Sequence, residues 1–178
     1  MKKTLVTGGS GLVGSYFWNT EDRERYTIWT SKTCDLMDRK LVENKLKGKW
    51  FDGVIHAAAK VGGVGANMSY KGDFFYDNAM MNINVIETAR KEGIEKLVCF
   101  LSTCVFPDNV EYPLTEKKIH LGPPHTSNDA YAYAKRMADI QIRAYREQYG
   151  LNYKSVIPTK IGRAHVWTPV TRSSRMPS

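Results

Sequence analysis

The stretch Thr7-Gly8-Gly9-Ser10-Gly11-Leu12-Val13-Gly14 decides the fold of this chain, because it joins a short apolar run to a predicted helix that begins near Gly11. Gly8 permits a tight turn, Gly11 lets the backbone approach a pyrophosphate, and Gly14 lets the helix pack against the strand. Amide groups at the N-terminus of that helix then hold the phosphates. A glycine triplet alone is a weak signal, but one between a strand and a helix predicts a nucleotide-binding site.

Outside this stretch, apolar runs and helical periods alternate along the chain. Strands are predicted at 4–6, 27–29, 54–58, 97–101 and 153–157, and long helices at 73–91 and 129–149. Asp38 is expected to cap a shorter helix, and 62–65 is expected to form a flexible loop. Strands and helices in alternation, with short connections, predict an α/β fold: a doubly wound, Rossmann-type parallel sheet with right-handed crossovers.

Composition is typical of a single globular domain. The 178 residues are 42% hydrophobic and 25% charged, and no stretch reaches the roughly 20 apolar residues of a membrane helix. The formal charge of +8 would fit nucleic-acid binding, but four of the basic residues lie in the acid-free stretch 160–178. The remaining 22 basic and 18 acidic residues leave +4 over 1–159. We therefore predict a cytoplasmic protein that binds neither nucleic acid nor membrane.

Residues 160–178 do not continue the pattern, since they lack periodicity and contain no acid. A disordered tail or an irregular loop would fit. However, Ile161–Val170 and Ser174–Ser178 match a common sequencing adapter translated in one reading frame. We therefore predict a non-native tail at 160–178, preceded by an incomplete Rossmann domain at 1–159.

The type of nucleotide is indicated by Thr30-Ser31-Lys32, which follows the second strand. These residues lack the Asp or Glu that would hold a ribose 2′-hydroxyl, and Lys32 can instead meet a 2′-phosphate. This favours NADP(H), although a solvated lysine explains Lys32 equally well. Asp35 and Leu36 are expected beside the adenine. On this interpretation 1–159 is an NADP-binding domain.

Residues suited to proton transfer lie at the start of the helix at 129–149. Tyr131 and Lys135 share one face of that helix, and Ser102 ends the central strand, where sites form in such sheets. An ammonium near a phenol lowers the pKa of the phenol, and a serine hydroxyl polarises a carbonyl. Because Tyr-x-x-x-Lys arises about once by chance among ten tyrosines, only its context predicts carbonyl reduction.

The cysteines and histidines carry weaker signals. The three cysteines are irregularly spaced, which predicts neither a disulfide framework nor a zinc site. Cys104 lies two residues after Ser102 and could act as an acid or base on carbon, although spacing alone favours a structural role. Cys99 is predicted to be a core residue, and His56 either a core residue or one that supports the site from behind.

Four stretches make the chain similar to a known family. They are Ala57-Ala58-Ala59-Lys60-Val61-Gly62-Gly63, Leu101-Ser102-Thr103-Cys104-Val105-Phe106-Pro107, Gly122-Pro123-Pro124-His125 and Tyr131-Ala132-Tyr133-Ala134-Lys135-Arg136-Met137. With them the chain resembles the extended short-chain dehydrogenase/reductases and, more closely, the GDP-L-fucose synthase family. The resemblance covers essentially all of 1–159. Its Ser-Thr-Cys-x-Phe-Pro segment separates this family from most sugar-nucleotide epimerases and dehydratases.

The resemblance implies epimerisation of the GDP-sugar GDP-4-dehydro-6-deoxy-D-mannose at C3 and C5, and then reduction at C4 with NADPH, to GDP-L-fucose. Tyr131 would donate a proton, Lys135 would assist it and bind the ribose, and Ser102 would polarise the carbonyl. Cys104 would be one epimerisation acid or base, which reverses the preference from spacing. The cofactor site would be lined by Gly8 to Gly14, Ala57, Ala58, Leu101, Pro158 and Thr159.

The family precedent also implies a homodimer through the two long helices. Its second epimerisation residue, a downstream histidine, has no counterpart here, because His165 belongs to the adapter-like tail. The sugar-nucleotide domain is also missing, so we expect this chain by itself to be inactive and poorly folded. Two alternatives stay open: another, NAD-dependent sugar-nucleotide epimerase or dehydratase, and a non-catalytic NADP-binding module.

Overall fold

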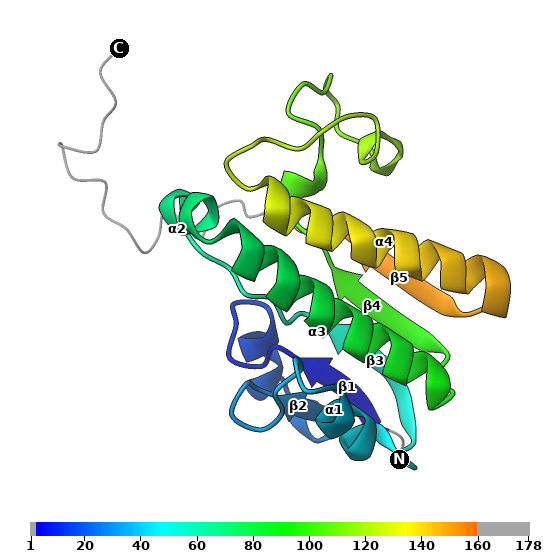
Figure 1. The fold of residues 1–178 in the computed structure, drawn as a ribbon. Helices are drawn as coiled ribbons and strands as arrows, with labels where there is room; N and C mark the ends of the chain where they lie inside the picture. Colours follow the sequence, from blue (N-terminus) through cyan, green and yellow to red (C-terminus); the bar gives the residue numbers. More distant parts are fainter. Residues whose placement is uncertain (1–2, 160–178) are drawn as a thin grey trace.

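Five parallel strands form one sheet in the computed structural model, which describes residues 3–159 (Figure 1). The strands are β1 (Lys3–Thr7), β2 (Tyr26–Trp29), β3 (Phe51–His56), β4 (Lys96–Phe100) and β5 (Asn152–Val156), in the order β2-β1-β3-β4-β5. The chain steps to one side of β1 for β2 and to the other side from β3 onward, so a topological switch point lies between β1 and β3. The predicted Rossmann-type sheet is confirmed. The predicted tail at 160–178 lies outside the described residues.

The described residues contain four α-helices: α1 (Arg39–Leu46), α2 (Val64–Ser69), α3 (Lys71–Lys91) and α4 (Asp129–Tyr149). α3 and α4 lie side by side along one face of the sheet, and α1 packs beside α3 (Figure 1). Asp38 caps α1 as predicted, since its Oδ1 accepts the N–H of Leu41 at 3.0 Å. Gly150 ends α4 with a φ of +67°. None of these helices is long and apolar enough to cross a membrane.

The predicted helix from Gly11 is wrong. Residues Gly14–Trp18 form only a 3-10 helix, η1, and a second one, η2 (Arg23–Arg25), leads directly into β2. The indole N–H of Trp18 donates to the carbonyl of Gly9 at 2.9 Å, so the aromatic end of η1 folds back onto the glycine stretch. So short a helix has few aligned peptide dipoles. The expected phosphate site at a helix N-terminus is therefore not supported by a helix dipole.

Most strand bounds differ from the expected ones by one residue, and larger differences occur at the third strand and after it. The third strand ends at His56 rather than at residue 58. The stretch 62–65, expected to be a flexible loop, instead leads into α2 at Val64. The side-chain amide of Asn67 stabilises this turn by donating to the carbonyls of Gly62 (2.9 Å) and Gly63 (3.1 Å). A side-chain to backbone contact of this kind, although local, leaves no periodic pattern in the sequence.

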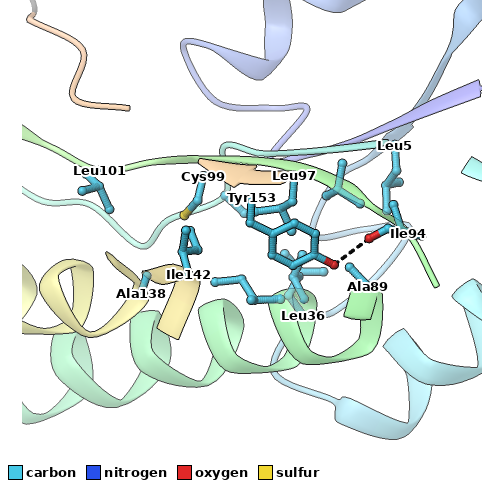
Figure 2. Packing of buried hydrophobic residues seen from close by; sticks show 14 of the residues in the cluster. Leu5, Leu36, Ala89, Ile94, Leu97, Cys99, Leu101, Ala138, Ile142 and Tyr153 are labelled. Atoms are coloured by element: carbon cyan, nitrogen blue, oxygen red, sulfur yellow. Dashed lines mark hydrogen bonds between the residues drawn. The ribbon is translucent and has the colours of Figure 1, made fainter. Parts of the chain in front are cut away.

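The core lies between the sheet and the helices α1, α3 and α4, and Figure 2 shows part of it. The ring of Tyr153 is fully buried there, and its hydroxyl donates to the carbonyl of Ile94 at 2.8 Å. Cys99 packs in the same cluster and is completely buried, which confirms the prediction that it is a core residue. Alternate residues of each strand therefore point toward the helices. This packing fixes the positions of β4 and of the loop that follows it.

Candidate cofactor and catalytic site

The glycine stretch makes two approaches too close for any other residue. Gly8 has a φ of +79°, and a Cβ on it would lie 2.6 Å from the amide nitrogen of Ala58. A Cβ on Gly14 would collide with the carbonyl of Gly8. These contacts confirm that glycines at both positions let the turn pack against the end of β3 and against η1.

The same stretch presents free amide groups. The N–H of Gly9 donates to the carbonyl of Trp29 (2.8 Å) and that of Gly11 to the carbonyl of Gly8 (2.9 Å). By contrast, the N–H groups of Ser10, Leu12 and Val13 find no acceptor among residues 3–159. Unpaired N–H groups close together in a turn attract anions, so the stretch retains a phosphate-binding character without a regular helix.

A cavity of about 260 Å³ opens at the switch point, beside this turn. It is lined by Gly8, Ser10, Gly11, Trp29, Ser31, Cys34, Asp35, Leu36, Ala57, Ala58, Ala59 and Met81. The structure therefore brings together seven of the residues predicted to bind a cofactor: Gly8, Ser10, Gly11, Asp35, Leu36, Ala57 and Ala58. Sequence reasoning missed the other five, although Trp29 and Ser31 follow from the rule that ligands bind at the carboxyl ends of strands.

Other predicted cofactor residues do not line this cavity: Gly9, Leu12, Val13, Gly14, Lys32, Leu101, Lys135, Pro158 and Thr159. Lys32 is exposed in the turn after β2. Leu101 is buried just beyond β4, while Pro158 and Thr159 are exposed beyond β5. The carboxylate of Asp35 accepts the N–H of Met37 at 2.9 Å and so shapes the turn that follows β2. Between the end of β2 and Asp35 this turn contains no Asp or Glu.

A second cavity, of about 210 Å³, contains the predicted catalytic groups. It is lined by Val61, Gly62, Asn67, Ser102, Cys104, Asn128 and Tyr131. Ser102 directly follows β4, and Cys104 lies in the 3-10 turn η3 (Thr103–Val105). Tyr131 lies in the first turn of α4. Three of the four predicted catalytic residues thus share one cavity, although they come from two separate parts of the chain.

Lys135, the fourth, lies one helical turn beyond Tyr131 and is 1% exposed. Its ammonium donates to the carbonyl of Phe100, at the end of β4, at 2.9 Å. This bond ties α4 to the strand that leads into Ser102. Burial lowers the pKa of Lys135 below its ordinary value.

The expected lowering of the Tyr131 pKa by Lys135 is not found. Burial raises the pKa of the Tyr131 phenol well above its ordinary value, and the neighbouring Cys104 and Cys99 raise it further. Burial also raises the pKa of the Cys104 thiol, which the Ser102 hydroxyl and the Lys135 ammonium partly oppose. Both groups therefore keep their protons at neutral pH in this structure.

His56 connects this region to the glycine turn through buried hydrogen bonds. The side-chain N–H of Asn82 donates to the carbonyl of Ala134 (3.2 Å), so its oxygen accepts from Nε2 of His56 (3.0 Å). Nδ1 of His56 then accepts the hydroxyl proton of Thr7 at 2.7 Å. Burial lowers the pKa of His56 to about 3, so the ring is neutral, as befits the predicted core histidine.

A third cavity, of about 310 Å³, adjoins the catalytic one and shares Cys104 and Asn128 with it. His125 and Asp108 also line it. Nδ1 of His125 accepts the N–H of Ser127 at 3.1 Å, so the ring carries its proton on Nε2 when neutral. Cys104 therefore faces two connected spaces rather than one.

Comparison with known proteins matches this arrangement. A family model described as "NAD dependent epimerase/dehydratase family" matches residues 4–170. The GDP-L-fucose synthase of Dictyostelium discoideum is 45% identical over 169 residues, which cover 92% of this chain and 53% of that protein. The probable GDP-L-fucose synthase of Drosophila melanogaster is 43% identical over 170 residues, covering 93% and 53%.

Among solved structures, a GDP-L-fucose synthetase from Naegleria fowleri bound to NADP is 43% identical, with a TM-score of 0.79. The match covers 89% of this chain and 53% of that one. The chain thus spans about half the length of the curated relatives that it matches.

Proposed function

Because the chain belongs to the NAD dependent epimerase/dehydratase family, we propose that it supplies the cofactor site and the proton-transfer groups of a GDP-L-fucose synthase. The enzyme would epimerise GDP-4-dehydro-6-deoxy-D-mannose at C3 and C5 and reduce it at C4. The observation that carries this proposal is the single cavity lined by Ser102, Cys104 and Tyr131. The names of the relatives from Dictyostelium and Drosophila support it.

The residues at the switch point fit NADP(H). A Cβ at Gly8 or Gly14 would fill the turn, and the unpaired amides of Ser10, Leu12 and Val13 suit a pyrophosphate. Asp35, Leu36, Ala57 and Ala58 line the adjoining cavity, and Lys32 suits a 2′-phosphate. Gly9, Leu101, Lys135, Pro158 and Thr159 complete the proposed site. When bound, the cofactor supplies a hydride to the substrate carbonyl carbon.

For the reduction, Tyr131 and Ser102 act on the substrate carbonyl oxygen. The Ser102 hydroxyl donates a hydrogen bond to that oxygen and polarises the carbonyl. The Tyr131 hydroxyl then gives its proton to the same oxygen as negative charge develops there. A raised pKa suits this role, because the phenol is protonated at neutral pH. Lys135 positions the start of α4 through its bond to the carbonyl of Phe100 and carries the compensating positive charge.

For the epimerisations, Cys104 exchanges a proton at a carbon next to the carbonyl. Its thiolate removes the proton, and the thiol can return one, while Ser102 stabilises the charge on the carbonyl oxygen. Burial works against thiolate formation, and the Ser102 hydroxyl and the Lys135 ammonium work in its favour. Cys104 thus needs nearby positive charge to serve as a base.

The test measures NADPH oxidation by the longest protein that the gene encodes, with GDP-4-dehydro-6-deoxy-D-mannose as substrate. Tyr131→Phe should lower kcat by about 10²–10⁴-fold, because it removes the proton donor. Tyr16→Phe is the matched control, since Tyr16 is 70% exposed and outside the cavities described.

Two results would contradict the proposal. Turnover of UDP-glucose without net NADPH consumption would identify an NAD-dependent sugar-nucleotide epimerase instead. Nucleotide binding without any activity, unchanged by Tyr131→Phe, would identify a non-catalytic binding module. Comparing NADPH with NADH in the same assay tests the proposal that Lys32 binds the 2′-phosphate of the cofactor.

We also propose a cytoplasmic homodimer. The outer faces of α3 and α4 expose apolar side chains, among them Phe75 (43%) and Ile140 (52%). Pairing these faces would form a four-helix contact between two copies and cover these side chains. Light scattering of the purified protein should therefore give twice the monomer mass, and a monomer mass at micromolar concentration would contradict this assignment.

A further inference from the structure

Arg136, on α4 directly after Lys135, is a buried cation without an acidic partner. It is 6% exposed, and no carboxylate among residues 3–159 forms an ion pair with it. Nε donates to the carbonyl of Val105 and Nη1 donates to the carbonyl of Gly122, both at 2.7 Å. Nη2 is buried and has no partner in the described part of the chain. Burying an unpaired charge is costly, so this arrangement calls for an explanation.

The two carbonyls belong to the two segments that frame Cys104. Val105 directly follows Cys104 and closes η3, where its N–H donates to the carbonyl of Ser102 at 3.1 Å. Gly122 begins the segment that leads to His125, and His125 lines the third cavity together with Cys104. One planar guanidinium therefore sets the spacing between the cysteine turn and the opposite wall of that cavity.

Arg136 also contributes to the electrostatic surroundings of the thiol. The charged and titratable groups around Cys104 are Lys135, Arg136 and Tyr131 on α4, and Asp108 and His125 from the loop. Of these, Lys135 and Arg136 are buried cations, whereas the side chain of Asp108 is 53% exposed. Both cations favour the thiolate, while burial opposes it.

We infer that Arg136 is a positioning residue for Cys104: its guanidinium fastens the Cys104 turn to the Gly122 segment and places a fixed positive charge beside the thiol. Arg136 serves the carbon proton exchange and not the delivery of a proton to oxygen by Tyr131. The part of this inference that concerns catalysis rests on the proposed function, whereas the part that concerns the thiol does not.

The first experiment measures the rate of Cys104 alkylation by iodoacetamide as a function of pH in the longest protein that the gene encodes, with the modified residue located by peptide mass spectrometry. Cys34 and Cys99 are 2% and 0% exposed, so Cys104 is the accessible thiol of the folded chain. Arg136→Met should slow alkylation at pH 7 by about twofold to threefold and move the pH profile upward, because the thiolate population falls tenfold per pKa unit. The matched control is Arg143→Met, because Arg143 lies seven residues further along α4 and pairs with Asp139. This variant should change neither the alkylation rate at pH 7 nor the pH profile.

The second experiment separates the two reactions in the longest protein that the gene encodes. Arg136→Met should slow deuterium exchange from solvent into C3 and C5 of the substrate at least about tenfold more than it slows reduction at C4. If the wild-type protein does not act on the GDP-sugar, the proposed function fails, and the alkylation profile still decides whether Arg136 acts on the thiol.

Arg136→Lys covers the case in which Arg136→Met does not fold. A lysine keeps the charge but lacks the planar fork that donates to both carbonyls. We expect a nearly unchanged alkylation profile together with a selective loss of deuterium exchange. An unchanged alkylation profile in folded Arg136→Met would overturn the inference, as would an equal loss of exchange and reduction in Arg136→Lys.

Discussion

At the scale of single residues, burial decides how the proposed catalytic groups titrate. The Tyr131–Lys135 spacing suggests an ammonium that lowers the pKa of the phenol, yet the Lys135 ammonium instead donates to the carbonyl of Phe100. The phenol is left with few neighbours that favour its charged form, and desolvation raises its pKa. Tyr131 is therefore suited to give a proton, and Cys104 depends on nearby cations to take one.

Gly8 gives a residue-scale prediction about the cofactor turn. Gly8→Ala adds a Cβ 2.6 Å from the amide nitrogen of Ala58, just beyond β3, at a positive φ, so it should destabilise the fold by about 3 kcal/mol or more and abolish NADP binding. The measurements are urea unfolding and titration with NADP. Gly48→Ala is the matched control, because Gly48 has a φ of +66° but no atom within 4 Å of the added Cβ. Gly48→Ala should lower the free energy of unfolding by only about 1 kcal/mol. Equal losses in the two variants would contradict the steric argument.

At the scale of secondary-structure elements, a polar cluster joins α3 to α4. Glu87 on α3 accepts two hydrogen bonds from Arg90, at 2.9 and 2.8 Å, and a third from the hydroxyl of Tyr145 on α4 at 2.6 Å. The Arg90 guanidinium also lies 4.6 Å from the ring centre of Tyr149 on α4. The long helices are therefore held together by directional bonds as well as by apolar packing.

This cluster predicts how stability depends on pH. The hydrogen bonds from Arg90 lower the pKa of Glu87 to about 2, compared with 4.5 for a free side chain. The contribution of Glu87 to stability is therefore full above about pH 4.5 and is lost as the pH falls toward 2. Glu87→Gln should lower the free energy of unfolding at pH 7 and converge with the wild type as the pH approaches 2.

The measurement is urea unfolding of the longest protein that the gene encodes, at several pH values between 7 and 2. Glu147→Gln, at an exposed position on α4, serves as the control and should follow the wild type throughout. If the free energies of unfolding of the wild type and Glu87→Gln differ by a constant amount over this pH range, the charge of the Glu87 carboxylate does not contribute to stability.

At the scale of the whole molecule, the two faces of the sheet differ. Val54, Leu97 and Cys99 are buried, Leu97 and Cys99 under α3 and α4, as Figure 2 shows for β4. By strand alternation, Ile55, Val98 and Phe100 point to the opposite face, where each remains partly exposed. Val98 pairs with Ile55 of β3, and Phe100 with Val156 of β5, so these side chains form a continuous apolar surface among the described residues.

This surface predicts the behaviour of the 178-residue chain by itself. It should bind the dye anilinonaphthalene sulfonate and self-associate at micromolar concentration, as fluorescence and light scattering can measure. Val98→Thr should reduce both effects, whereas Ile140→Thr, on the outer face of α4, should leave dye binding unchanged. A monomer that melts cooperatively and binds no dye would refute the expectation that the isolated chain is poorly folded.

Elements governed by local rules could be predicted from the sequence. The bounds of α4 agree with the expected 129–149, because an apolar period runs up to a helix-ending Gly150. The cap at Asp38 and the strand Lys96–Phe100, expected at 97–101, were also recognisable, since capping and apolar runs act over a few residues. Gly14 could be assigned for the same reason, because its close contact is with Gly8 in the same turn, and the positive φ of Gly8 is likewise a local feature, whereas the contact of Gly8 with Ala58 is not.

Contacts between distant segments could not be predicted in this way. Trp18 turns back onto Gly9 and replaces the expected helix with η1, and Met81 of α3 reaches the cofactor cavity. The sequence by itself determined the order of elements and most chemical groups of the site, because propensity, capping and turn geometry depend on neighbours in the chain. Only the tertiary structure decided which groups share a cavity, what Lys135 and Arg136 bind, and how Tyr131 titrates, because burial and charge depend on neighbours in space.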